Sequence, residues 1–266
     1  VEQHEDVDVA NLRGKDEVNA LYENQINEIV FDHVTFGYTK EKKHGKEDSV
    51  PVGIHNAVLA DISFSISKGD YVAVTGTSGC GKSTMLKLLM GIYRPQEGSI
   101  TVALRDGTGI AIEDMRRLFA YVPQGNFLMG GSIRDVITLG TYSRMESNHM
   151  DVDDQLDKAI RLACADFVYE LPLQLDTMLG EKGAGLSEGQ MQRIAIARAL
   201  YADCPVLILD ESTSALDEQT EERLLHNLRE LTDKTVLVVT HRPKARSICN
   251  RQIHFEEGNG VQTGLC

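Results

Sequence analysis

One short run of the sequence has the residue types and spacing needed to hold phosphate groups. The pattern G-x-x-x-x-G-K-[ST] is met by Gly76, Thr77, Ser78, Gly79, Cys80, Gly81, Lys82 and Ser83. Glycines let the backbone turn tightly, so that successive N–H groups point inward and form a concave anion site. The lysine of this pattern can reach the β- and γ-phosphates of a nucleotide, and the serine hydroxyl can bind Mg²⁺. We therefore predict a nucleotide site here, which extends to Thr84.

The sequence on either side of this phosphate loop supports a ligand-binding role. A strand-like run, Tyr71–Thr75, precedes the loop, and a helical segment, Met85–Met90, follows it. The helix would point the positive end of its dipole at the phosphates. A glycine-rich turn without a ligand is the alternative, but both the spacing and the flanking elements argue against it. Within the loop, Cys80 is either a small filler or a thiol that a bound nucleotide shields from reagents.

The first part of the chain alternates between polar and strand-like segments. Residues 1–27 are polar and acid-rich and start without Met, so we expect a linker rather than a folded element. Strand patterns follow over 29–38, with an irregularity near His33, and over 62–66. The charged stretch between them, 39–52, is typical of an exposed loop. The folded domain is therefore expected to start at about residue 28.

The rest of the chain alternates strands with helices. The wholly apolar run Val206–Leu209 is typical of a parallel strand buried on both faces, and Thr235–Val239 is predicted to be a second buried strand. Between them, Leu224 and Leu228 repeat at helical spacing among charged residues. The middle of the chain, 133–202, is predicted to be mainly helical. Alternating strands and helices predict a parallel sheet that is covered by helices.

Composition limits the class of protein. With 266 residues, of which 42% are hydrophobic, the chain can form one α/β domain with a sizeable core. The formal net charge of −13 argues against nucleic acid and anionic lipid as partners, because both require a basic surface. No run approaches the roughly 20 apolar residues that span a bilayer. The five scattered cysteines are interpreted as free thiols, so we expect a soluble domain in a reducing compartment.

Further motifs, in a fixed order, resemble those of the ATPase domains of ABC transporters. Leu186–Gln190 resembles the signature motif, and Val206–Glu211 resembles the Walker B strand. The Q-loop, the D-loop, the switch histidine and the A-loop aromatic correspond to Gln124, Ser214–Asp217, His241 and Tyr38. The resemblance covers nearly all of 28–264. It implies an α/β fold with a phosphate-loop core and a mainly parallel sheet, an antiparallel β subdomain, and a helical subdomain inserted at about 125–200, within a domain that spans 28–266.

The resemblance implies ATP as the bound nucleotide and Mg²⁺ as the metal ion. Asp210 would hold Mg²⁺ together with Ser83 and Gln124, and Glu211 would polarise the attacking water. Adjacent acids are often a solvated pair, but here they end an apolar run, which favours the catalytic interpretation. His241 would contact the γ-phosphate and hold water and phosphate in line.

The catalytic group implied by the resemblance is Glu211, His241, Gln124 and Lys82. The loss of Lys82 is expected to impair nucleotide binding as well as turnover. Tyr38 would stack on the adenine, although an ordinary strand aromatic would look the same in the sequence.

The signature run has two compatible interpretations. Ser187 and Gln190 form the S-x-x-Q pattern of a capping box, which predicts a helix over Met191–Leu200. A capped helix start still presents N–H groups and a positive dipole, and ABC domains offer this end to ATP bound by a second copy. Ser187, Gly189 and Gln190 would thus bind ATP in trans in an ATP-dependent head-to-tail dimer, most simply of identical chains. Glu188 replaces the glycine that is commonest in this family, and we expect it to weaken the dimer modestly.

Details near the signature favour an exporter. Gly180–Gly183 resembles the X-loop of exporter ATPase domains, and residues 1–27 resemble the tether that follows a last transmembrane helix. The chain would then be part of a longer exporter, with a transmembrane partner domain, at the cytoplasmic side of the membrane. The transported solute stays open, because its site belongs to the membrane part.

Three alternatives to an exporter would each differ from it in a definable feature. An importer ATPase, made as a separate subunit, would carry the same core motifs. A DNA-repair ATPase would have a long coiled coil and basic surfaces, which this sequence lacks. A nucleotide-binding regulator that no longer hydrolyses ATP would be expected to lack Glu211 or His241, and both are present.

Overall fold

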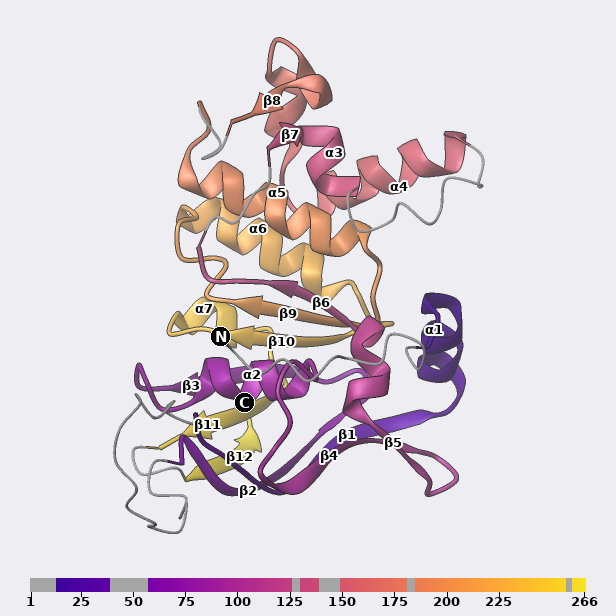
Figure 1. Ribbon diagram of the computed structural model, residues 1–266. Coiled ribbons are helices and arrows are strands. Elements are labelled where there is room, and N and C mark those ends of the chain that lie inside the picture. Colours follow the sequence, from indigo (N-terminus) through magenta and orange to yellow (C-terminus); the bar gives the residue numbers. More distant parts are fainter. Residues whose placement is uncertain (1–12, 39–56, 126–129, 139–148, 181–184, 257–259) are drawn as a thin grey trace, which may run out of the picture. The chain divides into compact units, whose positions relative to one another are not determined.

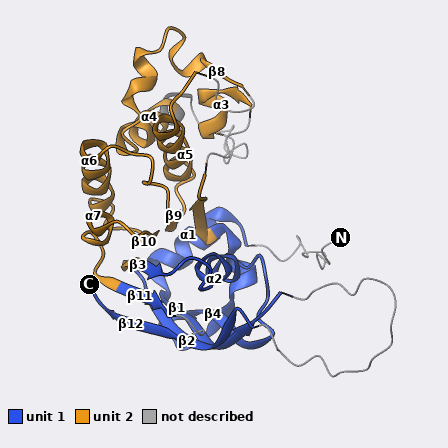
Figure 2. Ribbon diagram, turned by 90° about the vertical axis from the view of Figure 1, so that its left-hand side faces the viewer, with its two compact units in different colours: residues 1–68, 74–117, 252–265 blue, residues 69–73, 118–251, 266 orange. Residues whose placement is uncertain are grey.

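The structure of the chain is a computed structural model, which describes residues 13–38, 57–125, 130–138, 149–180, 185–256 and 260–266 (Figure 1). The chain forms two compact units, which Figure 2 distinguishes by colour. Unit 1 consists of residues 1–68, 74–117 and 252–265, and unit 2 of residues 69–73, 118–251 and 266. The phosphate loop therefore belongs to unit 1, and the Walker B strand belongs to unit 2.

Unit 1 contains an antiparallel sheet, as predicted for the β subdomain. Its strands run in the order β2 (Leu59–Ser67), β1 (Ile26–Phe36), β4 (Glu97–Leu104) and β5 (Gly109–Ala111). The irregularity predicted near His33 is confirmed, because the pairing of β1 with β2 shifts between Phe31 and Val34. At this point His33 has a φ of 51°, and a Cβ on Gly98 would lie 2.2 Å from the His33 carbonyl oxygen. The two backbones thus approach so closely that only glycine fits opposite the irregularity.

A helix precedes β1, where the sequence predicted a linker. Helix α1 (Lys15–Asn24) buries Val18 and Tyr22, which lie four residues apart on one face. The expectation that 1–27 contains no folded element is therefore wrong for residues 15–24. The helix was not predicted because the segment is acid-rich overall. Only two apolar side chains, one turn apart, are needed to pack it against the rest of the unit. Residues 1–12 and the loop predicted over 39–52 lie outside the described residues.

The remaining elements that lie wholly or partly in unit 1 hold the phosphate loop. Strands β12 (Val261–Leu265), β11 (Arg251–Phe255) and β3 (Tyr71–Gly76) are neighbours in one sheet. Helix α2 (Lys82–Leu89) follows the loop, and its side chains Met85, Leu86, Leu88 and Leu89 are buried. The short helix η2 (Ile112–Leu118) follows β5. Because α2 is anchored by this apolar face, its first turn is held at the end of β3.

Unit 2 contains the predicted parallel strands. β10 (Thr235–Val239) and β9 (Val206–Asp210) pair in parallel, and β6 (Phe119–Val122) pairs in parallel with the other side of β9 (Figure 1). Every residue of β9 and β10 is buried, as their continuous apolar runs predicted. The register places Val239 opposite Asp210, and Val122 opposite Leu209. The three strands therefore end together, and the residues that follow them emerge at one edge.

Helices make up most of the rest of unit 2, as predicted for 133–202. They are α3 (Ile133–Thr138), α4 (His149–Leu162), η4 (Asp166–Glu170), η5 (Gln174–Asp176), α5 (Glu188–Tyr201), α6 (Glu218–Arg229) and α7 (Pro243–Arg246). A short two-stranded sheet, β7 (Gly131–Ser132) with β8 (Met178–Leu179), lies among them. Leu224 and Leu228 of α6 are buried in the same apolar core as Ile194 of α5 and Ile160 of α4. Within the described part of the chain, every helix is too short or too polar to cross a bilayer.

Candidate functional site

The glycines of the phosphate loop occupy positions that no other residue could take without strain. Gly76 has a φ of +136°, and a Cβ there would lie 2.5 Å from the carbonyl oxygen of Phe255. Gly81 has a φ of +102°, and a Cβ there would lie 2.6 Å from Cδ2 of Leu59. Positive φ values and close backbone approach both favour glycine. The loop is therefore shaped by its packing in unit 1.

Lys82 lies inside this loop. Its side chain donates from Nζ to the carbonyl oxygens of Gly76, at 2.8 Å, and Thr77, at 2.7 Å, and the residue is only 7% exposed. Helix α2 begins at Lys82. Its N-cap residue is Gly81, and no side chain forms a capping hydrogen bond to the first turn. Uncapped N–H groups at a helix start suit an anion, and an ammonium group beside them adds positive charge. Ser83, the next residue, is exposed.

Tyr38 stands beside the start of α2, as the A-loop prediction requires. Its hydroxyl shares a hydrogen bond of 3.1 Å with Oγ1 of Thr84, and the residue is 47% exposed. The rings of Phe36 and Tyr93 contact it edge-on, with centroids 5.3 Å and 5.8 Å away. An exposed aromatic ring held in this way can stack on a base, which is a sequence-tolerant contact. Unit 1 thus brings together the residues predicted to bind adenine and those predicted to bind phosphate.

In unit 2, Asp210 ends β9 as a buried carboxylate. The residue is 5% exposed, and its Oδ2 accepts a hydrogen bond of 3.0 Å from the hydroxyl of Tyr121 on β6. The pKa of Tyr121 is raised well above its ordinary value. Burial is the largest cause, and the negative charge of Asp210 is the next. The role of Tyr121 was not predicted from the sequence. The available signal was its position in the sequence, three residues before Gln124.

Three predicted catalytic residues come together directly after the parallel strands. Gln124 donates from Nε2 to Oε2 of Glu211 at 2.7 Å, and Nε2 of His241 lies 3.7 Å from Oε1 of Glu211. These residues follow β6, β9 and β10, which end at one edge of the sheet. Glu211 is therefore held between a neutral donor and an imidazole, with its side chain only 28% exposed. Lys82, the fourth predicted catalytic residue, belongs to unit 1.

The backbone of Glu211 is strained. Its φ is +48°, a left-handed conformation that costs a residue other than glycine roughly 1–2 kcal/mol. Two backbone hydrogen bonds hold it there: its N–H donates to the carbonyl of Val239 at 3.0 Å, and its own carbonyl accepts from the N–H of Ser214 at 3.2 Å. Strain of this kind is found where the surrounding structure fixes a functional side chain.

The signature run forms the predicted capping box at the start of α5. Ser187 Oγ accepts from the N–H of Gln190 at 3.2 Å, and Gln190 Oε1 accepts from the N–H of Ser187 at 2.8 Å. A Cβ on Gly189 would lie 2.8 Å from the carbonyl oxygen of Ala215, so a larger residue would push against the D-loop. The signature glycine is thus required by packing within the chain, whatever it binds.

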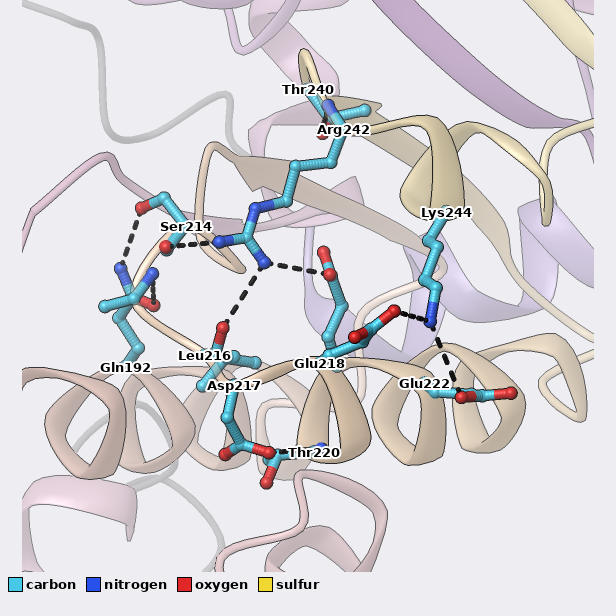
Figure 3. A network of polar contacts seen from close by, with 12 residues as sticks. Gln192, Ser214, Leu216, Asp217, Glu218, Thr220, Glu222, Thr240, Arg242 and Lys244 are labelled. Carbon is cyan, nitrogen blue, oxygen red and sulfur yellow. Dashed lines mark hydrogen bonds and ion pairs between the residues drawn. The ribbon is translucent and has the colours of Figure 1, made fainter.

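Two polar residues whose roles were not predicted from the sequence hold the D-loop. Gln192, which is 3% exposed, donates to Oγ of Ser214 at 3.3 Å and accepts from the N–H of Ala215 at 3.2 Å. Arg242, next to His241, contacts the same loop from the other side (Figure 3). The predicted X-loop, Gly180–Gly183, lies mostly outside the described residues.

The donors present suit ATP and Mg²⁺. Unit 1 offers backbone N–H groups, an ammonium group and a hydroxyl, which match phosphate oxygens. Unit 2 offers the carboxylate of Asp210 and the amide oxygen of Gln124, whose amide nitrogen is engaged by Glu211. Mg²⁺ prefers oxygen ligands of this type and keeps several waters. Unit 1 thus carries groups that suit the phosphates of ATP, and unit 2 carries oxygen atoms that suit Mg²⁺.

Sequence and structural relatives identify the family. The family model described as ABC transporter matches residues 59–214. The chain belongs to this family. Relatives include the Lactococcin-G-processing and transport ATP-binding protein LagD of Lactococcus lactis, which is 38% identical over 208 residues, covering 78% of this chain and 29% of LagD. The ATP-dependent lipid A-core flippase of Vibrio parahaemolyticus is 40% identical over 215 residues, covering 80% of this chain and 36% of the flippase.

The solved structure of a bacterial Atm1-family ABC exporter with ATP bound matches with a TM-score of 0.74 and 32% identity, covering 90% of this chain and 39% of that chain. The predicted family and the ABC ATPase fold are thereby confirmed. Because the matches cover 29% and 36% of the two relatives, this ABC domain spans roughly a third of their length.

Proposed function

We propose that this ABC domain hydrolyses ATP and thereby drives the export of a solute across a membrane. One observation carries the proposal: Glu211 directly follows a buried Asp210 and is held by Gln124 and His241. A carboxylate in this setting can accept a hydrogen bond from water and orient it for attack on a phosphate. A domain that only binds nucleotide has no need of this strained and supported carboxylate.

Each group has a role in the proposed reaction. The phosphate loop binds the triphosphate through its N–H groups, Lys82 and Ser83, and Tyr38 stacks on the adenine. Glu211 orients a water whose oxygen bonds to the γ-phosphorus, while the bond to the β-phosphate oxygen breaks and ADP leaves. His241 holds the γ-phosphate in line with this water. Mg²⁺, bound by Ser83, Gln124 and Asp210, would neutralise charge on the phosphates.

A second copy of the domain completes the proposed site. The capped start of α5 presents N–H groups and a positive dipole, so Ser187, Gly189 and Gln190 would contact ATP bound by the partner copy. The same domain, residues 28–266 extended by α1, would dock on a transmembrane part at the cytoplasmic side of the membrane. Residues before α1 are proposed as the tether to that part.

The names of the relatives favour export over import. They describe a lipid A-core flippase, a Lactococcin-G-processing and transport protein, and a toxin translocation protein. The structural relative is described as an ABC exporter. These descriptions share transport or translocation and differ in cargo, and the structural relative is named an exporter, so the proposal names the direction and leaves the solute open.

The test compares the wild-type chain with Glu211→Gln in two measurements. Steady-state hydrolysis should fall by at least about 10²–10³-fold in the variant, because a preorganised catalytic group is lost. Solution molar mass with MgATP should show a stable dimer in the variant, since bound ATP persists, and little dimer in the wild type. Glu230→Gln, which changes an exposed carboxylate at the end of α6, is the control and should behave as wild type. Equal hydrolysis by Glu211→Gln and wild type would refute the assignment of Glu211.

A further inference from the structure

Arg242 joins the loop of the switch histidine to the D-loop. Its Nη2 donates to the carbonyl oxygen of Ser214 at 2.7 Å, and its Nη1 donates to the carbonyl oxygen of Leu216 at 3.3 Å (Figure 3). These carbonyls belong to residues two apart, so one guanidinium group spans the turn of the D-loop. The planar fork of arginine can serve both acceptors at once, which the single ammonium of a lysine cannot do in the same geometry.

A buried carboxylate fixes the guanidinium group in place. Nη1 of Arg242 also donates to Oε2 of Glu221 on α6 at 2.8 Å, and Glu221 is only 3% exposed. The other carboxylate oxygen of Glu221 has no hydrogen-bond partner among the described residues. Arg242 therefore pairs with a desolvated carboxylate, and charge-assisted bonds of this kind are short and directional. Its side chain cannot leave the D-loop without unpairing that carboxylate.

A continuous set of contacts links Arg242 to both proposed catalytic residues, Glu211 and His241. The carbonyl of Glu211 accepts from the N–H of Ser214 at 3.2 Å, and the carbonyl of Ser214 accepts from Arg242. Arg242 follows His241 in the chain, and Nε2 of His241 lies 3.7 Å from Oε1 of Glu211. The N–H of Arg242 donates to Oγ1 of Thr240 at 3.0 Å, which fixes the turn on the other side of the histidine. These contacts together set the distance between the side chains of Glu211 and His241.

We propose that Arg242 is a positioning residue, which holds His241 and the strained turn of Glu211 in register for hydrolysis. This inference rests on the proposed function, because it concerns the same reaction. Arg242 itself need not touch ATP. Its loss would let the histidine and the carboxylate move independently, and misplacement of about 1 Å can cost up to about 10²-fold in rate.

The central variant is Arg242→Lys, which keeps the charge beside Glu221 but loses the fork. We expect kcat for ATP hydrolysis to fall at least tenfold, with KM for ATP within about twofold of wild type. Lys244→Ala is the matched control, because Lys244 lies two residues further along and pairs with exposed Glu218 and Glu222. Its kcat should equal that of wild type.

A second variant separates positioning from stability. Glu221→Gln removes the charge that anchors Arg242 but leaves both D-loop carbonyls as acceptors. If Arg242 acts by positioning, Arg242→Lys loses much more kcat than Glu221→Gln for an equal or smaller loss of stability against urea. If kcat instead follows stability across the two variants, Arg242 is only a structural residue and the inference is overturned.

The two proposals fail in different ways. An inactive Glu211→Gln with a fully active Arg242→Lys would overturn this inference and leave the proposed function standing. A wild-type chain that binds ATP without hydrolysing it, alone and with its transport partner, would overturn both.

Discussion

Tyr121 offers a direct test of how the buried Asp210 is held. Replacing Tyr121 with phenylalanine removes one hydroxyl and keeps the ring that packs in unit 2. The lost hydrogen bond, 3.0 Å long, reaches a carboxylate that is 5% exposed, so it is a charge-assisted bond in a buried setting. Bonds to charged groups contribute about 1.5–3 kcal/mol. We therefore expect Tyr121→Phe to lower the free energy of unfolding at pH 7 by about 2 kcal/mol.

The same tyrosine gives the chain a dependence on alkaline pH. Burial and the charge of Asp210 raise the pKa of Tyr121 in the folded state above the unfolded value of 10.0. Between these two pKa values the folded chain binds more protons than the unfolded chain, so stability falls as pH rises above about 10. One proton corresponds to a slope of at most about 1.4 kcal/mol per pH unit, and partial exposure of the phenol lowers it. Tyr121→Phe should remove this part of the slope.

Urea unfolding at pH 7 and at several values between pH 9 and pH 11 measures both effects. Tyr93→Phe is the control at pH 7, because the Tyr93 ring stacks on Phe36 and its change should stay within about 0.5 kcal/mol. Hydrolysis by Tyr121→Phe, followed against Mg²⁺ concentration, tests whether the hydroxyl also orients Asp210 for the metal. The reasoning is refuted if Tyr121→Phe matches wild type in urea at pH 7 and in its alkaline slope.

Three further predictions concern the ligand-binding motifs. Ser187→Ala should lower the unfolding free energy by about 1 kcal/mol in urea, because it removes the N-cap of α5, whereas Ser187→Thr should restore most of it. Tyr38→Ala should weaken ATP binding by about 1–3 kcal/mol in a nucleotide titration, and Tyr38→Phe should retain most of the affinity; equal affinity for all three proteins would rule out stacking. A maleimide should label Cys80 more slowly when MgATP is present, and equal labelling rates would exclude the shielded thiol.

Local motifs were predictable because they depend on residues close together in the chain. The turn of the phosphate loop is dictated by glycines within eight positions, and the capping box of α5 needs only Ser187 and Gln190. The buried strands β9 and β10 were equally clear, since a continuous apolar run has few other solutions. The helix α1 was missed because its two buried side chains, Val18 and Tyr22, are hidden in a charged segment. Composition averages over a segment, whereas burial depends on one face.

The sequence by itself determined which residues could bind a nucleotide and in which order they occur. It could also predict that Gln124, Glu211 and His241 act together, but only through resemblance to a family. Tertiary structure decided how they meet: parallel pairing brings the ends of β6, β9 and β10 to one edge and places Gln124 2.7 Å from Glu211. It also decided the roles of Tyr121, Gln192 and Arg242. The partner of Tyr121 lies 89 positions away in the chain, those of Gln192 lie 22 and 23 positions away, and the D-loop and α6 partners of Arg242 lie 21 to 28 positions away. Such contacts have no local pattern, because a side chain acquires a distant hydrogen-bond partner only when packing brings the two segments together.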